Sequence, residues 1–214
     1  MRLENRTFRL GPMDNGTYLI VCPETKEAAV VDVGFEAETV IAAIEQERLK
    51  VRYLLNTHAH YDHVCGMLAV QRACGGTYWL HPGDRPLLDN VNQQAALFGL
   101  PPIETPREVN DLADGQTLPL GRGAISVIHT PGHSPGGVCF RSDDLLWVGD
   151  TLFAGSIGRT DLPGGSFEQL ARSIRTRLFT LGDAVRVLPG HGGETTIGEE
   201  RLHNPFVGEA ATFS

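Results

Sequence analysis

Three histidines and an aspartate stand within six residues of one another, in the stretch Thr57-His58-Ala59-His60-Tyr61-Asp62-His63. A short apolar run, Tyr53 to Leu55, comes before them, and the apolar spacing of an amphipathic helix begins at Val64. This order predicts a buried strand that ends in a loop, with a helix directly after the loop. Such a loop is held by a rigid scaffold on both sides, which is where functional residues tend to lie.

The spacing inside this stretch indicates a metal site. Successive side chains of an extended loop alternate, so we expect His58, His60 and Asp62 to point to one side. His63 lies at the start of the helix and can be aimed at a neighbouring point. Imidazole and carboxylate are ligands that Zn²⁺ and Fe²⁺ accept readily. A polar surface loop, the alternative reading, does not explain four such side chains between an apolar strand and an apolar helix.

Three later residues have the same setting as the first motif. His133, Asp150 and His191 each follow an apolar run that predicts a strand, and each has a glycine directly before it. Taken singly, an aspartate after glycine is more often a turn residue, and a lone histidine is more often structural. Taken with the first motif, they predict one pocket with seven metal-binding side chains.

The remaining apolar pattern mixes strands and helices along the chain. Further strands are predicted at 17–22, 28–33, 77–80, 125–128, 138–141, 145–148 and 185–188. Amphipathic spacing predicts helices over 36–49, 85–98 and 167–178. Strands that are often adjacent in sequence, mixed with helices, suggest two sheets packed together with helices outside. Without a linker-like composition or a repeat, residues 1–214 are expected to form a single domain.

Composition narrows the classes of partner. Asp and Glu number 26 against 18 Lys and Arg, which gives a net charge of −8. An acidic surface repels polyphosphates, so nucleic acid and anionic membranes are not expected partners. The chain has neither an apolar run of about 20 residues nor a signal-type start. Its four cysteines, without C-x-x-C spacing, favour a reducing cytoplasm.

The order H-x-H-x-D-H, followed by His133, Asp150 and His191, resembles the metallo-β-lactamase superfamily. The stretches Gly149–Asp161 (GDTLFAGSIGRTD) and Gly190–Arg201 (GHGGETTIGEER), the latter followed by Asn-Pro-Phe, resemble its glyoxalase II (hydroxyacylglutathione hydrolase) branch. The resemblance implies an α/β fold, the αβ/βα four-layer sandwich, in which two mixed sheets are flanked by helices and the metals lie at one edge.

The resemblance also implies a ligand set for two divalent metal ions, zinc foremost, with iron and manganese as alternatives. A first ion would be held by His58, His60 and His133. A second would be held by Asp62, His63 and His191, with Asp150 bridging both. Water bound by such ions ionises near neutral pH and can attack a carbonyl. The implied substrate is a small-molecule thioester, a glutathione conjugate, with Asp62 and Asp150 as the catalytic carboxylates.

The sequence departs from that branch in two places. Few residues follow His191, so the C-terminal helical extension that supplies glutathione-binding basic residues is not expected. Arg159 and Asp161 stand where the branch has a lysine and a nearby tyrosine. Arg159 is therefore a candidate for binding a substrate carboxylate. An ion pair with Asp161 is the equally weighted alternative.

Other functions compete with thioester hydrolysis. The persulfide dioxygenase branch shares the Gly-Arg-Thr-Asp run at 158–161 and uses one iron, here at His58, His133 and Asp150. The Gly-Ser-Ile run at 155–157 and the Thr-Thr-Ile-Gly run at 195–198 favour the hydrolase. A lactonase, a β-lactamase and a non-catalytic metal-binding module are weaker alternatives. The isolated His81, His129 and His203 are expected to be structural.

Overall fold

The computed structural model describes residues 2–209 and 211. The first of its two large sheets is built from the N-terminal part of the chain and has the order β1-β2-β3-β4-β5-β6. Its strands are β1 (Glu4–Leu10), β2 (Asn15–Val21), β3 (Glu27–Val31), β4 (Lys50–Leu55), β5 (Thr77–Leu80) and β6 (Asn110–Asp111). Strands β1 to β3 are antiparallel neighbours, and β3 to β6 run parallel, so the sheet is mixed.

The second large sheet has the order β14-β13-β10-β9-β8-β7. Its strands are β7 (Thr117–Leu120), β8 (Gly123–His129), β9 (Val138–Ser142), β10 (Leu145–Gly149), β13 (Arg186–Pro189) and β14 (Thr195–Thr196). Only β10 and β13 pair in parallel; the other neighbours are antiparallel. Between β10 and β13 the chain forms a small hairpin of β11 (Leu152–Phe153) and β12 (Ser156–Ile157).

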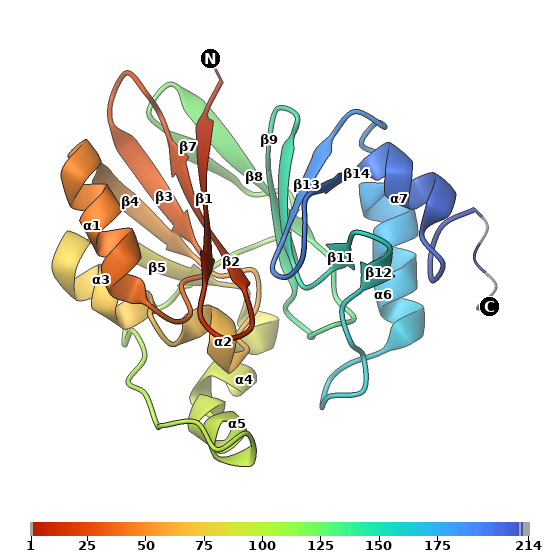
Figure 1. Cartoon of the computed structure of the whole chain (residues 1–214), viewed down its shortest axis with the longest axis horizontal. Helices are drawn as coiled ribbons and strands as arrows, with labels where there is room; N and C mark the ends of the chain where they lie inside the picture. Colours follow the sequence, from red (N-terminus) through yellow and green to blue (C-terminus); the bar gives the residue numbers. More distant parts are fainter. Residues whose placement is uncertain (1, 210, 212–214) are drawn as a thin grey trace.

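Helices cover the outer face of each sheet (Figure 1). On the first sheet these are α1 (Ala37–Glu47) and α3 (Met67–Cys74), while α2 (Tyr61–Val64), α4 (Arg85–Asp89) and α5 (Val91–Leu97) lie below the lower end of the sheet in Figure 1. The 3₁₀ turn η1 (Pro82–Asp84) directly precedes α4. On the second they are α6 (Phe167–Ser173), continued by the π-helical turn η2 (Ile174–Leu178), and α7 (Ile197–His203). The two sheets face each other between these helical layers.

Alternating side chains of the buried strands fill three apolar layers. In β10, Leu145 and Trp147 point into the layer between the two sheets, while Leu146 and Val148 point toward α6 and α7. The residues of a strand alternate between its two faces, so a strand buried on both sides reads as a continuous apolar run. The four-layer α/β sandwich predicted from the sequence is confirmed, as are all the predicted strands.

Two predicted elements differ in the structure. The helix expected over 85–98 is divided into α4 and α5 at Asn90, whose side chain donates to the Pro86 carbonyl at 2.8 Å and competes with the helical pattern. The helix expected from Val64 already begins at Tyr61, with α2, and is likewise interrupted before α3 begins at Met67. Its first turn, α2, ends before Gly66, where the chain packs so closely against Gly34 that a side chain would overlap the Gly34 carbonyl.

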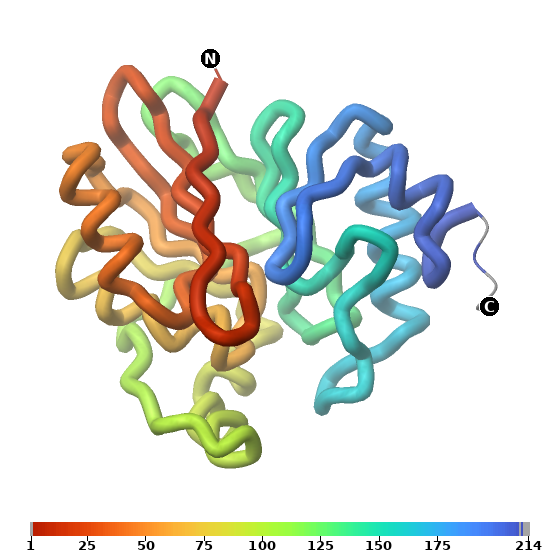
Figure 2. Tube along the Cα trace, in the orientation of Figure 1, coloured from red at the N-terminus to blue at the C-terminus, as the bar shows by residue number. Residues whose placement is uncertain are grey.

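The turn between β1 and β2 crosses from the first sheet to the second. In Figure 2 this turn lies beside the chain that follows β13. The Gly16 N–H donates to the Gly190 carbonyl at 2.7 Å, and the Tyr18 hydroxyl donates to the Pro189 carbonyl at 2.6 Å. The end of β13 is therefore held by the N-terminal hairpin.

Candidate metal centre

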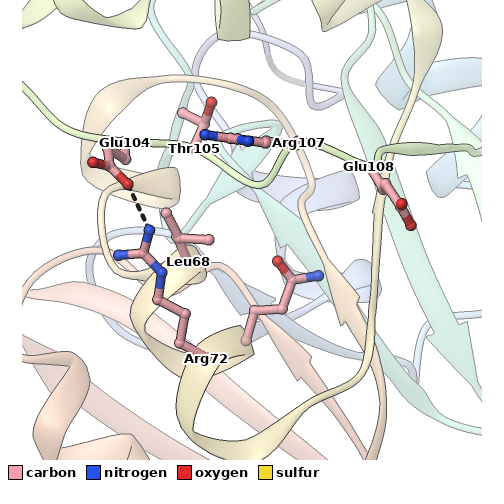
Figure 3. A pocket seen from close by; sticks show the side chains of 7 residues that line it. Leu68, Arg72, Glu104, Thr105, Arg107 and Glu108 are labelled. Carbon is pink, nitrogen blue, oxygen red and sulfur yellow. Dashed lines mark hydrogen bonds and ion pairs between the residues drawn. The ribbon is translucent and has the colours of Figure 1, made fainter.

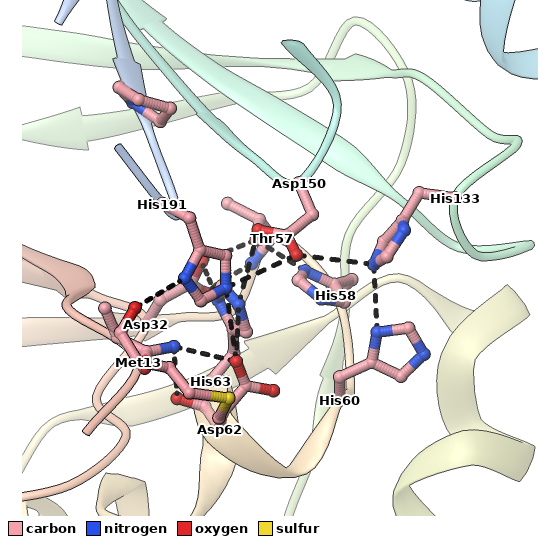
Figure 4. A network of polar contacts seen from close by, with 12 residues as sticks. Met13, Asp32, Thr57, His58, His60, Asp62, His63, His133, Asp150 and His191 are labelled. Carbon is pink, nitrogen blue, oxygen red and sulfur yellow. Dashed lines mark hydrogen bonds and ion pairs between the residues drawn. The ribbon is translucent and has the colours of Figure 1, made fainter. Parts of the chain in front are cut away.

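The seven predicted ligand residues lie at one edge of the sandwich, because each follows the carboxyl end of a strand. The stretch His58–His63 follows β4, and His133 lies in the loop after β8. Asp150 directly follows β10, and His191 comes shortly after β13. Figure 4 shows side chains from both sheets turned toward one another across this edge.

His58, His60 and His133 form a first group. One ring nitrogen of each lies within 4.8 Å of the others, and His133 Nε2 is 2.9 Å from His60 Nδ1. His58 is only 2% exposed. Burial, reinforced by the neighbouring histidines, lowers the pKa of His60 to about 3 and holds that of His58 well below its usual value. The rings of His58 and His60 are therefore neutral at neutral pH, which is the form that binds a metal.

Asp62, His63 and His191 form a second group beside the first. Asp62 Oδ2 lies 3.4 Å from His63 Nε2 and 3.3 Å from His191 Nε2. Burial opposes the ionisation of Asp62, but the nearby rings of His63 and His191 and a hydrogen bond from Asn15 hold its pKa below the usual range. Burial alone would lower the pKa of His63, yet Asp62 and Asp150 raise it to about 10. The second group thus concentrates negative charge around one imidazole.

Asp150 lies between the two groups. Its Oδ1 is 3.4 Å from His63 Nε2, and its Oδ2 is 3.5 Å from His191 Nε2 and 3.7 Å from His133 Nε2. This carboxylate reaches both sets of imidazoles (Figure 4). Gly190 permits the close approach, since a Cβ atom at that position would overlap Asp150 Oδ1.

The polar atoms of this centre fit divalent metal ions. His58 Nε2, His63 Nε2 and Asp150 Oδ1 are buried and have no hydrogen-bond partner. A buried polar atom without a partner costs about 1–3 kcal/mol, so native proteins seldom leave several together. Imidazole nitrogen and carboxylate oxygen are the donors that zinc and iron accept. A pair of ions, one at each group, would satisfy all three atoms.

One detail of the expected geometry is wrong. Asp62 was expected to share a side of an extended loop with His58 and His60. The loop is not extended that far, because α2 begins at Tyr61 and turns Asp62 away from the first group. Asp62 instead joins His63 and His191.

A buried carboxylate that sequence reasoning missed, Asp32, supports both groups from behind. Asp32 follows β3 and is 2% exposed. It accepts hydrogen bonds from the Thr57 N–H at 2.8 Å and the Thr57 hydroxyl at 2.5 Å, and it lies 3.0 Å from His63 Nδ1. His58 Nδ1 contacts the same Thr57 hydroxyl at 3.0 Å. An aspartate directly after an apolar strand was the available signal, the same one that identified Asp150.

Backbone carbonyl groups orient two further histidines, His133 and His191. His133 Nδ1 lies 2.8 Å from the Arg159 carbonyl, and His191 Nδ1 lies 3.1 Å from the Met13 carbonyl. A carbonyl only accepts, so both rings carry their proton on Nδ1 and leave Nε2 for a metal. Asp84, another buried carboxylate, accepts from the Ala59 N–H, the Ser134 hydroxyl and the Gly136 N–H, and so ties together the loops of the first group.

The Arg159 side chain makes the ion pair that was one of the two predicted alternatives. Its Nε and Nη2 atoms each lie 2.7 Å from an oxygen of Asp161, and the Arg159 side chain is 54% exposed. Its binding of a substrate carboxylate stays a prediction. The three other histidines lie outside both groups: His81 stacks on His129 with ring centroids 4.1 Å apart, and His203 contacts Glu199.

A separate hollow of about 380 Å³ lies on the surface beside α3 (Figure 3). Its lining includes an exposed ion pair in which Arg72 Nη2 is 2.6 Å from Glu104 Oε2. None of the seven ligand-type residues lines it. Among residues 2–209 and 211, no helix is both long and apolar enough to cross a membrane.

Comparison with known proteins adds independent evidence. Residues 11–191 match the sequence model of a family described as the metallo-beta-lactamase superfamily. The hydroxyacylglutathione hydrolase GloC of Haemophilus influenzae is 39% identical over 194 residues, which are 88% of this chain and 91% of that protein.

Two solved structures resemble the fold closely. BLEG-1, a B3 metallo-beta-lactamase, superposes with a TM-score of 0.88 at 37% identity and covers 95% of this chain and 99% of its own. TTHA1623 in a di-iron-bound form gives a TM-score of 0.86 at 37% identity, with coverage of 94% and 99%. Both likenesses extend over nearly the whole chain.

Proposed function

Since the chain belongs to the metallo-β-lactamase superfamily, we propose that it is a metal-dependent hydrolase of glutathione thioesters that uses two divalent ions. The position of Asp150 carries the two-ion part of this proposal. Its two oxygens lie 3.4 Å from His63 Nε2 and 3.7 Å from His133 Nε2, which belong to the two different groups. The similarity to GloC supports the choice of a thioester.

When bound, two such ions supply hydroxide at neutral pH and polarise the substrate carbonyl. The residues of the chain then have distinct tasks. The buried, neutral rings of His58 and His60 present lone pairs without first losing a proton. Asp150 places Oδ1 near His63 of the second group, and its Oδ2 lies between His191 of the second group and His133 of the first. Asp62, ionised at neutral pH, is the carboxylate to which we assign the proton of the attacking water. A thiolate leaves without obligatory protonation, so no separate acid is required.

Arg159 is proposed to recognise the thiol part of the substrate. Its backbone carbonyl lies 2.8 Å from His133 Nδ1, which fixes this segment at the edge of the centre. Its guanidinium already holds a carboxylate, that of Asp161, in a two-point contact. A glutathione carboxylate could replace Asp161 in the same geometry, because guanidinium and carboxylate match in pairs.

Zinc is the first candidate for the metal, with iron and manganese as alternatives. Sets of histidine and aspartate accept all three, and availability decides among them. The likeness to TTHA1623 in its di-iron-bound form supports testing iron beside zinc.

The proposal extends to organisation and location. The apolar layer between the sheets contains residues of both, which supports one hydrolase domain within these 214 residues. The four cysteines are unpaired thiols, which supports action in the reducing cytoplasm.

Hydrolysis of S-lactoylglutathione by the purified protein loaded with zinc, iron or manganese tests the function directly. Release of free glutathione is followed with a thiol reagent, alongside metal analysis of each preparation. His60→Ala is expected to abolish turnover, since it removes a ligand of the first group. His203→Ala is the matched control, because it removes an exposed histidine outside both groups.

Two other activities are measured on the same preparations. Oxygen uptake with glutathione persulfide tests the one-iron dioxygenase, and hydrolysis of a chromogenic β-lactam tests the likeness to BLEG-1. The proposal is supported if thiol release requires His60 and its rate exceeds the rates of oxygen uptake and of β-lactam hydrolysis. Persulfide-dependent oxygen uptake without thioester cleavage would overturn it.

A further inference from the structure

The hairpin of β1 and β2 contacts the second group of ligands through a buried asparagine. Asn15, the first residue of β2, is 1% exposed. Its Nδ2 donates to Asp62 Oδ2 at 2.8 Å and to the Asp62 carbonyl at 3.1 Å. One amide group thus fixes both the side chain and the backbone of a ligand residue.

The turn of this hairpin also contacts His191, another member of the second group. The Met13 carbonyl accepts from His191 Nδ1 at 3.1 Å. Arg9 donates to the carbonyls of Gly192 and Asp14, and so ties the chain after His191 to the turn. Asn15 therefore does not sit on a free loop, because its neighbours are anchored to the second sheet.

Among the described residues, no hydrogen bond from this hairpin reaches the first group. His58 is oriented by Thr57, and His133 is oriented by the Arg159 carbonyl. Within the described part of the chain, the Asn15 side chain donates only to Asp62. The support given by Asn15 is thus selective for one of the two groups.

We propose that Asn15 is a positioning residue for the second metal ion, the ion held by Asp62, His63 and His191. This inference rests on the proposed two-ion centre. A carboxylate can rotate about its Cβ–Cγ bond and present either oxygen. The Asn15 donor fixes Oδ2 in place, 3.3–3.4 Å from the Nε2 atoms of His63 and His191. Partners that orient a ligand in this way typically change metal affinity ten- to a hundredfold.

Two substitutions separate positioning from simple packing. Asn15→Leu keeps the approximate shape of the side chain but removes its donor, and Asn15→Ala serves if the leucine variant does not fold. Asn110→Leu and Asn110→Ala are the matched controls. Asn110 donates to the Tyr78 carbonyl at 3.0 Å within the same sheet and contacts no ligand residue.

The experiment measures zinc binding to each full-length protein by competition with a chelator, together with thermal unfolding of the metal-free proteins. We expect wild type and the Asn110 variants to bind two ions. The Asn15 variants should bind the first ion with unchanged affinity and the second at least tenfold more weakly. Loss of both affinities in parallel would indicate general damage to the fold and would overturn the assignment.

Two further outcomes would also refute it: an Asn15 variant with both dissociation constants unchanged, or a wild-type protein that binds only one ion. Because the readout is metal binding, it does not depend on the substrate. If wild type binds two ions and cleaves no thioester, the proposed function fails while the role of Asn15 stands.

Discussion

Replacing Asp32 by asparagine should weaken metal binding, because this carboxylate determines which nitrogen of His63 carries the proton. Asp32 Oδ1 accepts from two amide donors, Asn56 Nδ2 at 3.0 Å and the Thr57 N–H at 2.8 Å. These two N–H donors cannot accept a hydrogen bond, so the oxygen of the new asparagine must stay at the position of Oδ1. Its NH₂ group must then take the position of Oδ2. There it faces His63 Nδ1 at 3.0 Å and donates to it. The proton of a neutral His63 then moves to Nε2, the atom that faces Asp62 and Asp150.

The magnitude follows from the four hydrogen bonds that Asp32 makes with Asn56, Thr57 and His63. A hydrogen bond to a charged group contributes about 1.5–3 kcal/mol, and a neutral hydrogen bond contributes about 0.5–1.5 kcal/mol. Replacing the carboxylate by an amide therefore weakens each of the four hydrogen bonds by about 1 kcal/mol. Removing a buried charge regains part of this loss. We expect the metal-free variant to unfold with a free energy about 2–4 kcal/mol lower, and the second ion to bind ten- to a hundredfold more weakly.

Urea denaturation in the presence of a chelator measures the first quantity, and zinc competition measures the second. Asp84→Asn is the matched control. Asp84 is also a fully buried carboxylate, but its donors are two backbone N–H groups and a hydroxyl, none of which belongs to an imidazole. It should lose stability without losing the second ion selectively. Unchanged affinity for both ions in Asp32→Asn would refute the reasoning about the His63 proton.

Three other predictions follow from the centre. Asp150→Ala should lower kcat by at least about two orders of magnitude with an unchanged circular dichroism spectrum, because both groups lose their shared carboxylate; near-normal turnover would count against a two-ion mechanism. The zinc affinity of the second group should rise about tenfold per pH unit from about pH 7 to 9. Burial would lower the pKa of His63, but Asp62 and Asp150 raise it to about 10, so zinc must displace the proton of His63 when it binds. An affinity that does not change with pH would contradict this. Arg159→Ala should raise KM for S-lactoylglutathione about tenfold with little change in kcat, while a thioester without carboxylates is unaffected; an equal loss on both substrates would make Arg159 structural.

The sheets could be predicted because their strands are buried on both sides. Within β2, β3 and β10, the runs Tyr18–Val21, Ala28–Val31 and Leu145–Val148 contain only apolar residues, which leaves few alternatives to a central strand. The edge strand β1 gave no such signal. Its seven residues, ENRTFRL, are mostly polar, and its strand structure depends on pairing with β2 along its full length.

The seven ligand-type residues could be predicted as a set because each follows an apolar strand and has a side chain that binds metals. Their grouping around two points is a property of the folded chain, although the family resemblance implied it. Asn15 could not be identified in the same way. An asparagine next to glycine, directly after a turn, is ordinary, and only the fold of the β1–β2 hairpin against α2 brings its amide to Asp62.

Neither sheet alone supplies a complete set of ligands. The first group takes two histidines from the loop after β4 and one, His133, from the second sheet. The second group takes Asp62 and His63 from the first sheet and His191 from the second. Each ion would therefore bridge the interface that the apolar layer between the sheets holds together. Ligands that bind only the folded chain stabilise it by mass action, so metal binding and the packing of the two sheets are thermodynamically linked. A substitution that loosens the contact between the sheets, such as one in the β1–β2 turn, must then act on the metal centre even without touching a ligand.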